Sequence, residues 1–246
     1  MTSISKIIKD RLDQQGVSYF ANDNISDYIS EEELAKLQVE LKDKLEEVLD
    51  VLLIDRNNDH NTIETANRVA KMYLNEVFKG RYHKQPKVTD FPNYKNLDQI
   101  YTVGAISVRS ACSHHLVPII GKCWIGVIPS DRVIGLSKFN RITDWVMSRP
   151  QIQEEAAIQL ADTIEKLIKP KGLAVIVKAK HQCMTWRGVK DNDTEMVTSV
   201  MRGIFRDTAE ARSELMDIFK GQLYPSSKTF KYPKAGEDNS VVNLYV

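Results

Sequence analysis

The chain has 246 residues, of which 42% are hydrophobic and 27% are charged, the composition of an ordinary globular protein and not of a disordered or fibrous one. Its 34 basic and 33 acidic residues give a formal net charge of +1, which excludes a general basic surface for nucleic acid. No stretch is apolar for long enough to span a membrane, and the first residues become polar too early for a secretory signal. We therefore expect a cytoplasmic protein that binds neither nucleic acid nor a membrane.

The first part of the chain is predicted to be helical. Residues 1–30 show only weak helical periodicity and are expected to form an N-terminal arm. Ser30 and Glu33 have the spacing of a capping box, and leucines three and four residues apart follow as far as Leu52. This pattern predicts one long amphipathic helix.

A second helix is expected to begin at Thr65 and to end at Gly80, so that the two helices form an antiparallel pair. Residues 81–98 contain two prolines and many polar residues, which indicates a linker. Residues 31–98 are therefore predicted to form a helical N-terminal region with its linker.

From residue 99 the pattern changes to a mixture of strands and helices. The segments rich in β-branched residues predict strands at residues 100–110, 117–128 and 173–179, and a further strand pair at residues 181–189 and 196–205. Helices are expected at residues 137–145, 150–168 and 207–219. This order predicts an α+β domain over residues 99–220, with helices on one face of an antiparallel sheet, followed by an irregular extension at residues 221–246.

The histidines and cysteines are unevenly placed. Two short segments at predicted strand ends hold three of the five histidines and two of the three cysteines, namely Cys112, His114, His115, His181 and Cys183. Cys112 and His115 have a spacing that lets one turn present a thiolate and an imidazole to the same ion, and Cys183 can join them if the fold brings its segment alongside. Such a set leaves one zinc position open for a catalytic water, with His114 and His181 left over for proton transfer.

Two alternative interpretations remain at this point. A single Cys-x-x-His motif is a weak metal signal, and a pair of adjacent histidines is often only a polar part of a turn. Cys123 could also complete a closed site of three cysteines and one histidine, which would be structural and not catalytic. Cys123 lies in the middle of a predicted strand, however, where a small buried thiol is the usual occupant.

Several basic residues suggest an anionic substrate. Ser137, Lys138 and Arg141 lie at the start of a predicted helix, where free backbone N–H groups and the helix dipole favour anions. Arg187 follows the second cysteine segment. Each of these residues alone is typical of a solvated surface, but together with the candidate metal site they indicate a polyanion such as a triphosphate.

Gln153 and Glu154 begin the next predicted helix. The ordinary interpretation of Glu154 is a surface carboxylate that the helix dipole stabilises. The functional interpretation is recognition of a purine edge.

The motifs of this sequence resemble those of the GTP cyclohydrolase I family. The matching segments, in the family's order, are TANRVAKMYLNEVFKG, SACSHHLVPIIGKCWIGVIP, VIGLSKFNRI, RPQIQEE, KHQCMTWRGVK and MVTSVMRGIFR. The resemblance runs from about Leu34 to Phe219 and implies a tunnelling fold with a four-stranded antiparallel sheet, assembled as a homodecamer of two pentamers with active sites at subunit interfaces. The implied reaction opens the imidazole ring of the guanine of GTP, releases C8 as formate and yields 7,8-dihydroneopterin triphosphate.

The resemblance also implies roles for individual residues. Cys112, His115 and Cys183 would hold Zn²⁺, whose water attacks C8. His181 would protonate the purine nitrogen, and His114 would assist proton transfer. The chain departs from the family at Ser113, where the family usually has glutamate.

The remaining implied residues would bind GTP. Glu154 would anchor the guanine edge, and Gln153 would lie near the ribose. The triphosphate would be held by Ser137, Lys138, Arg141 and Arg187, with Arg68 and Lys71 reaching it from a neighbouring subunit.

Two rival functions fit the same fold. A deazapurine-processing enzyme such as a nitrile reductase would need a cysteine nucleophile and a nicotinamide site, and the Cys-Ser-His-His and His-Gln-Cys segments argue against it. An inactive or divergent relative would keep zinc only as a structural ion.

Overall fold

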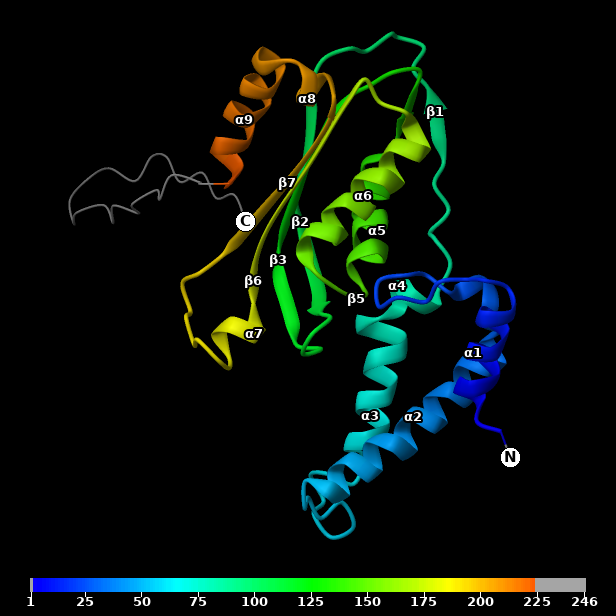
Figure 1. Ribbon diagram of the computed structural model, residues 1–246. Helices are drawn as coiled ribbons and strands as arrows, with labels where there is room; N and C mark the ends of the chain where they lie inside the picture. The colour runs from blue at the N-terminus through cyan, green and yellow to red at the C-terminus, as the bar shows by residue number, and fades with distance from the viewer. Residues whose placement is uncertain (1, 224–246) are drawn as a thin grey trace, which may run out of the picture.

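The computed structural model describes residues 2–223, so most of the predicted C-terminal extension lies outside the described residues. Figure 1 shows an α+β body above a group of N-terminal helices. Among the described residues, no helix combines the length and the apolar character that crossing a lipid bilayer requires.

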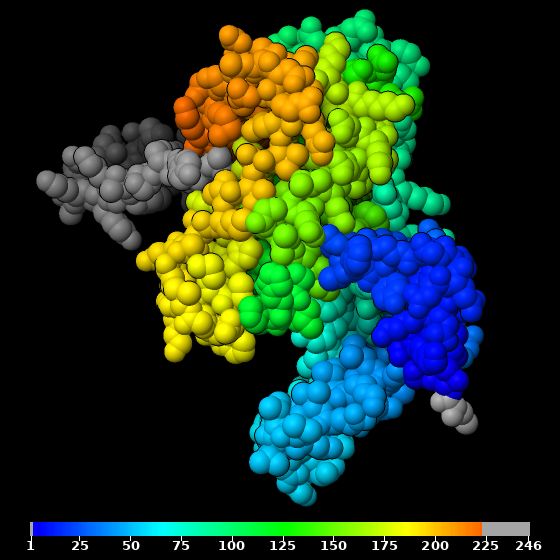
Figure 2. All heavy atoms as spheres, in the orientation of Figure 1, coloured from blue at the N-terminus to red at the C-terminus, as the bar shows by residue number. Residues whose placement is uncertain are grey.

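The N-terminal part consists of helices only. Its elements are α1 (Ile4–Gln14), a short 3₁₀ turn (Ser26–Tyr28), α2 (Glu31–Val51), α3 (Thr65–Lys71), a π-helical segment (Met72–Val77) and α4 (Lys79–Tyr82). Helices α2 and α3 pack against each other. In Figure 2 the end of α2 projects away from the body, and α2 contains no buried residue.

The start of α2 confirms the predicted capping box. The Ser30 hydroxyl accepts from the Glu33 backbone N–H at 3.1 Å, and the Glu33 carboxylate accepts from the Ser30 N–H at 3.0 Å. Arg11 of α1 also donates to this carboxylate at 2.9 Å, and the Arg11 hydrogen bond is the main reason that the pKa of Glu33 falls to about 2.

Residues 2–30 are more regular than the predicted arm. Helix α1 is stabilised because its Ile8 and Leu12 are buried against Ile25, which lies in the segment after the helix. The periodicity within the helix does not reveal this contact. Arg81 then fixes the connecting segment by donating to several of its backbone carbonyls, among them that of Tyr19 at 3.0 Å.

The body is built on one mixed sheet in the order β5-β2-β3-β6-β7. Its long strands are β2 (Tyr101–Cys112), β3 (Pro118–Ile128), β6 (Gly172–His181) and β7 (Met196–Gly203), and each is antiparallel to its neighbour. The two-residue β5 (Pro150–Gln151) joins β2 in parallel, and β1 (Asp90–Pro92) pairs with β4 (Arg132–Ile134) in a separate sheet.

The helices of the body lie on both faces of this sheet, so the prediction of one covered face is wrong. Helices α5 (Leu136–Met147) and α6 (Gln153–Ile168) cover one face, whereas α8 (Ile204–Asp207) and α9 (Ala209–Leu223) lie on the other (Figure 1). The reason is visible in β3, where Ile125 faces the first group and Trp124 packs with Phe219 of α9. A strand with apolar side chains on both faces is stable only if helices shield both faces of the sheet from water.

Two predicted elements are also wrong. Residues 181–189 do not form a strand, because β6 already ends at His181 and the helical turn α7 (Gln182–Thr185) follows it. Pro150 does not start a helix but pairs with Ala111 at the sheet edge, where a proline is tolerated, and α6 begins only at Gln153.

Candidate metal centre and active site

The sheet register brings the two histidine and cysteine segments to the same end of the sheet. Strand β2 ends at Cys112, and residues 113–116 form the turn that leads into β3. Ile119, at the start of β3, pairs with His181, the last residue of β6. The turn after Cys112 and the helical turn that carries Cys183 are therefore neighbours.

Cys112, His115 and Cys183 form a group that can hold a metal ion. One ligand atom from each residue lies within 4.8 Å of the others, and the Cys112 Sγ is 3.9 Å from the His115 Nδ1. Cys112 is buried, Cys183 is half-buried and His115 is exposed. Two sulfurs and one imidazole nitrogen are soft ligands, typical of zinc among the common biological metals.

The electrostatics of the two thiols fit a cation at this position. Burial, and then the neighbouring Cys112 sulfur, raise the pKa of the Cys183 thiol above its ordinary value, although Arg187 partly opposes the shift. Two thiolates this close repel each other without a counter-charge. A divalent cation between them supplies that charge, so the residues present fit a metal ion.

Cys123 does not belong to this group. It is fully buried in β3, opposite Ile106 of β2 and Val177 of β6, and burial raises the pKa of its thiol strongly. Its position confirms the prediction of a buried core thiol and leaves three candidate metal ligands in this group among the described residues.

His181 lies next to the metal group and is held by Gln153. The distance from His181 Nε2 to Gln153 Oε1 is 2.9 Å. Burial lowers the pKa of His181, and the negative charge of nearby Glu154 partly opposes this effect. Glu154 itself is exposed in the first turn of α6.

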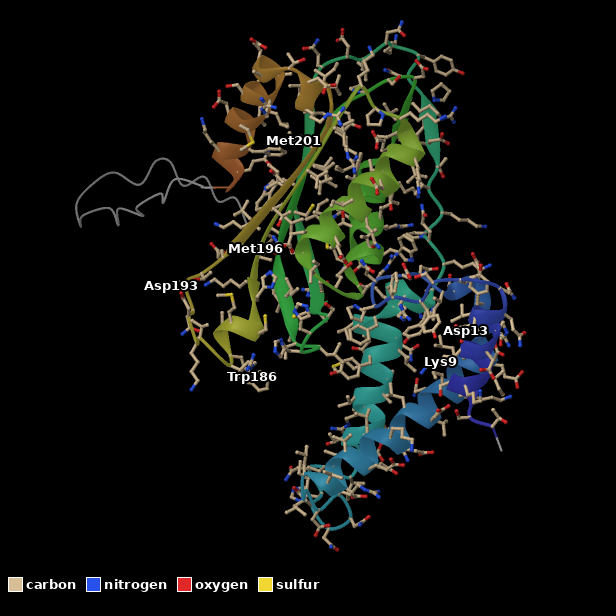
Figure 3. The ribbon with its side chains drawn as sticks, viewed as in Figure 1. Lys9, Asp13, Trp186, Asp193, Met196 and Met201 are labelled. Carbon is tan, nitrogen blue, oxygen red and sulfur yellow. The ribbon has the colours of Figure 1, made fainter. Side chains whose placement is uncertain are left out.

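Gln153 is buried at the start of α6 and bonds to other parts of the protein. Only 3% of it is exposed, and its amide nitrogen donates inside the protein to Val177, Met196 and Thr198. Figure 3 labels Met196 at the start of β7. The amide therefore contacts His181 and two strands of the sheet. No sequence pattern could reveal the bond to His181, because it depends on the register of β6 and β7.

The other two predicted residues near the metal group are exposed. The His114 ring lies perpendicular to that of His115, with 6.3 Å between the ring centres. Arg187 follows Trp186, which Figure 3 labels near α7, and its Nη1 lies 3.0 Å from the His115 Nε2.

The residues predicted to bind phosphate lie elsewhere on the chain. Ser137 is the second residue of α5, whose N-cap is Gly135, so the helix begins one residue before its predicted start at residue 137. Ser137 and Arg141 line a hollow of about 640 Å³ together with residues 102–106 of β2. Cys112 is six residues beyond Ile106 on the same strand, about 20 Å away at the usual rise per residue.

The remaining predicted residues lie on helices α5 and α3. Lys138 lies beside Ser137 in the first turn of α5. Arg68 and Lys71 are exposed on α3, in the N-terminal helical part. One copy of the chain therefore brings together the metal group, His181 and Glu154, but not the α5 residues with them.

Comparison with known proteins identifies the family. The family model described as GTP cyclohydrolase I matches residues 41–220 of this chain. The chain belongs to the GTP cyclohydrolase I family.

Curated relatives agree over most of the chain. The GTP cyclohydrolase 1 of Flavobacterium johnsoniae is 36% identical over 220 residues, which cover 86% of this chain and 96% of the relative. That of Vibrio parahaemolyticus is 35% identical over 217 residues, covering 88% and 97%. That of Photobacterium profundum is 39% identical over 180 residues, covering 71% and 82%. The GTP cyclohydrolase I match therefore spans nearly the full length of the first two relatives.

Proposed function

We propose that this protein is a zinc-dependent GTP cyclohydrolase I, which converts GTP and water to 7,8-dihydroneopterin triphosphate and formate. The observation that carries the proposal is the meeting of the ligand atoms of Cys112, His115 and Cys183 within 4.8 Å, beside His181, in a chain of this family. The names of the curated relatives support the same activity.

The metal is proposed to be zinc, held by Cys112, His115 and Cys183. The soft donor set supports this choice, and three protein ligands are the number typical of catalytic zinc sites. When bound, zinc supplies Lewis-acid activation of water for attack on C8 of the guanine. The Arg187 guanidinium beside His115 is close enough to this group to bind an anionic part of the substrate.

His181 and Glu154 are proposed to act on the guanine. A neutral imidazole beside the metal group can take up a proton and deliver it to the purine nitrogen as the imidazole ring of the guanine opens. The exposed carboxylate of Glu154 can accept from N1–H and the 2-amino group of guanine, whereas adenine has no proton on N1 and no amine on C2. His114, in the exposed turn, is placed to assist proton transfer.

The active site is proposed to be completed by a second copy of the chain. Ser137, Lys138 and Arg141 lie about 20 Å along β2 from the metal group, which supports their binding the triphosphate of a GTP molecule held by a neighbouring subunit. Arg68 and Lys71 of α3 are proposed to reach the same phosphates from a neighbour. Gln153 is proposed to lie near the ribose.

The sheet supports an assembly of this kind. Strand β7 lies at one edge, and residues 101–110 of β2 have no strand partner beyond β3 among the described residues, so edge strands can pair between copies and close a ring. We propose the homodecamer of two pentamers and the tunnelling fold that the family implies, with an antiparallel helical pair within residues 31–98 and the catalytic domain at residues 99–220.

The direct test is turnover of GTP with and without metal. The purified protein is incubated with GTP, and pterin fluorescence is followed before and after a chelator and then after zinc is restored. We expect the increase in pterin fluorescence to stop when the chelator is added and to resume when zinc is restored. Binding of GTP without any pterin would identify an inactive relative, and full turnover by metal-free protein would contradict the zinc proposal.

A further inference from the structure

Gln153 is a buried amide whose surroundings fix its orientation. Its Nε2 lies 3.0 Å from the Val177 carbonyl oxygen, 3.1 Å from the Met196 carbonyl oxygen and 3.1 Å from the Thr198 hydroxyl. Val177 and Thr198 are paired neighbours on β6 and β7. The side chain is therefore anchored to two strands of the sheet at once.

The two carbonyls decide which way the amide points. A carbonyl oxygen only accepts, so the NH₂ group of Gln153 must face Val177 and Met196. Its Oε1 then faces His181, 2.9 Å from the ring Nε2. Because an amide oxygen also only accepts, the Nε2 of His181 must carry the hydrogen of this bond. In the neutral ring, Nδ1 is then the nitrogen with the free lone pair.

We propose that Gln153 is a positioning residue that holds His181 as the tautomer with its proton on Nε2, so that Nδ1 is the ring nitrogen that exchanges a proton with the bound purine. The proposal rests on the proposed cyclohydrolase function. In each turnover Nδ1 of the half-buried His181 takes up one proton from solvent and passes it to the purine nitrogen, which leaves the ring neutral again, while the Nε2 proton stays in its bond to Gln153. The anchor on two strands keeps the ring in one orientation between turnovers.

The chain contains a matched control two residues earlier. Gln151 is also buried, with 1% exposed, and its Nε2 donates to the carbonyls of Val146 and Met147 and to the Ser110 hydroxyl. It shares the size, the burial and the backbone anchoring of Gln153 but bonds to no histidine among the described residues. Gln151→Met therefore measures the cost of losing a buried glutamine alone.

The test reads the tautomer directly. Histidine labelled with ¹⁵N gives five residues to resolve, and His181→Ala assigns the signal of His181 in solid-state NMR spectra of the full-length protein. At a pH where the ring is neutral, we expect a protonated Nε2 and an unprotonated Nδ1. Gln153→Met should give a mixture of both tautomers of His181, whereas Gln151→Met should keep the single tautomer. Thr198→Val should also keep it, because the carbonyls of Val177 and Met196 still orient the amide of Gln153.

The kinetic readout separates positioning from binding. Gln153→Met should lower kcat for GTP by about 10- to 100-fold, the usual effect of removing a hydrogen-bond partner behind a functional imidazole, and should change KM by less than about threefold. Thr198→Val should keep kcat within about threefold of the unsubstituted protein, because two acceptors remain.

Three results would overturn the proposal. One is a His181 with its proton on Nδ1 in the unsubstituted protein, which decides the matter even if Gln153→Met does not fold. The second is a Gln153→Met variant in which His181 keeps the single tautomer. The third is a Gln153→Met variant that keeps the full kcat for GTP. A protein that shows the expected tautomer but releases no pterin from GTP would refute the proposed function and leave the positioning role of Gln153 standing.

Discussion

The proposed division of the active site between two copies of the chain leads to a quantitative prediction. On one chain the metal group and Arg141 are separated along β2 by about 20 Å, because residues 102–106 face Arg141 and Cys112 lies six positions further on. Two defective variants should therefore complement each other in a mixed oligomer. The first is Cys112→Ser, and the second replaces Ser137, Lys138 and Arg141 by alanine.

The size of the effect follows from counting. If each site takes its metal group from one copy and its α5 residues from another, and if the variants mix at random in equal amounts, about one site in four has both parts intact. Each variant alone should have little activity, and the co-expressed mixture should reach about a quarter of the unsubstituted rate.

The assay is GTP turnover by co-expressed variants that carry different affinity tags and are purified through both. A control mixture of Cys112→Ser with Cys183→Ser should stay inactive, since both defects lie in the same metal group. A doubly tagged oligomer without restored activity would show that the metal group and the α5 residues act within one copy, contrary to the proposal.

Three further predictions concern single residues. Cys183→Ser should lose the metal and the activity, while Cys123→Ser should keep both, and metal analysis and GTP turnover of the purified variants test this. If Cys123→Ser loses as much metal as Cys183→Ser, Cys123 is a metal ligand. His181→Ala should lower kcat by about two to four orders of magnitude with little change in equilibrium GTP binding, and a loss of binding would contradict its proton-transfer role. The pKa of Glu33 is lowered to about 2, mainly by its hydrogen bond with Arg11, so its contribution to stability is present above pH 4.5 and is lost as the pH falls toward 2. Glu33→Gln should remove that part of the pH dependence in urea unfolding, and an unchanged acid profile would count against the ion pair.

The metal group could be predicted from sequence because its evidence is local. The spacing of Cys112 and His115 places both on one turn, and Cys183 follows a strand end, so only the pairing of β3 with β6 had to be supplied by the fold. The capping box at Ser30 is equally local, since its partner Glu33 lies three residues away.

The parts that sequence reasoning missed depend on contacts between distant segments. Helix α1 forms because Leu12 is buried with Ile25, although its own periodicity is weak. The second face of the sheet is covered by α8 and α9 because Trp124 of β3 packs with Phe219 of α9. The role of Gln153 depends on carbonyls of two strands that no local pattern joins to it.

The measurement that tests the central claim most directly follows the carbon atom that the reaction removes. The zinc-loaded protein is given GTP labelled with ¹³C at C8, and NMR records the label while pterin formation is measured in the same sample. The account predicts one labelled formate for each 7,8-dihydroneopterin triphosphate, and neither product from Cys112→Ser. Label that stays in the purine ring, or formate released at the same rate by Cys112→Ser, would contradict it.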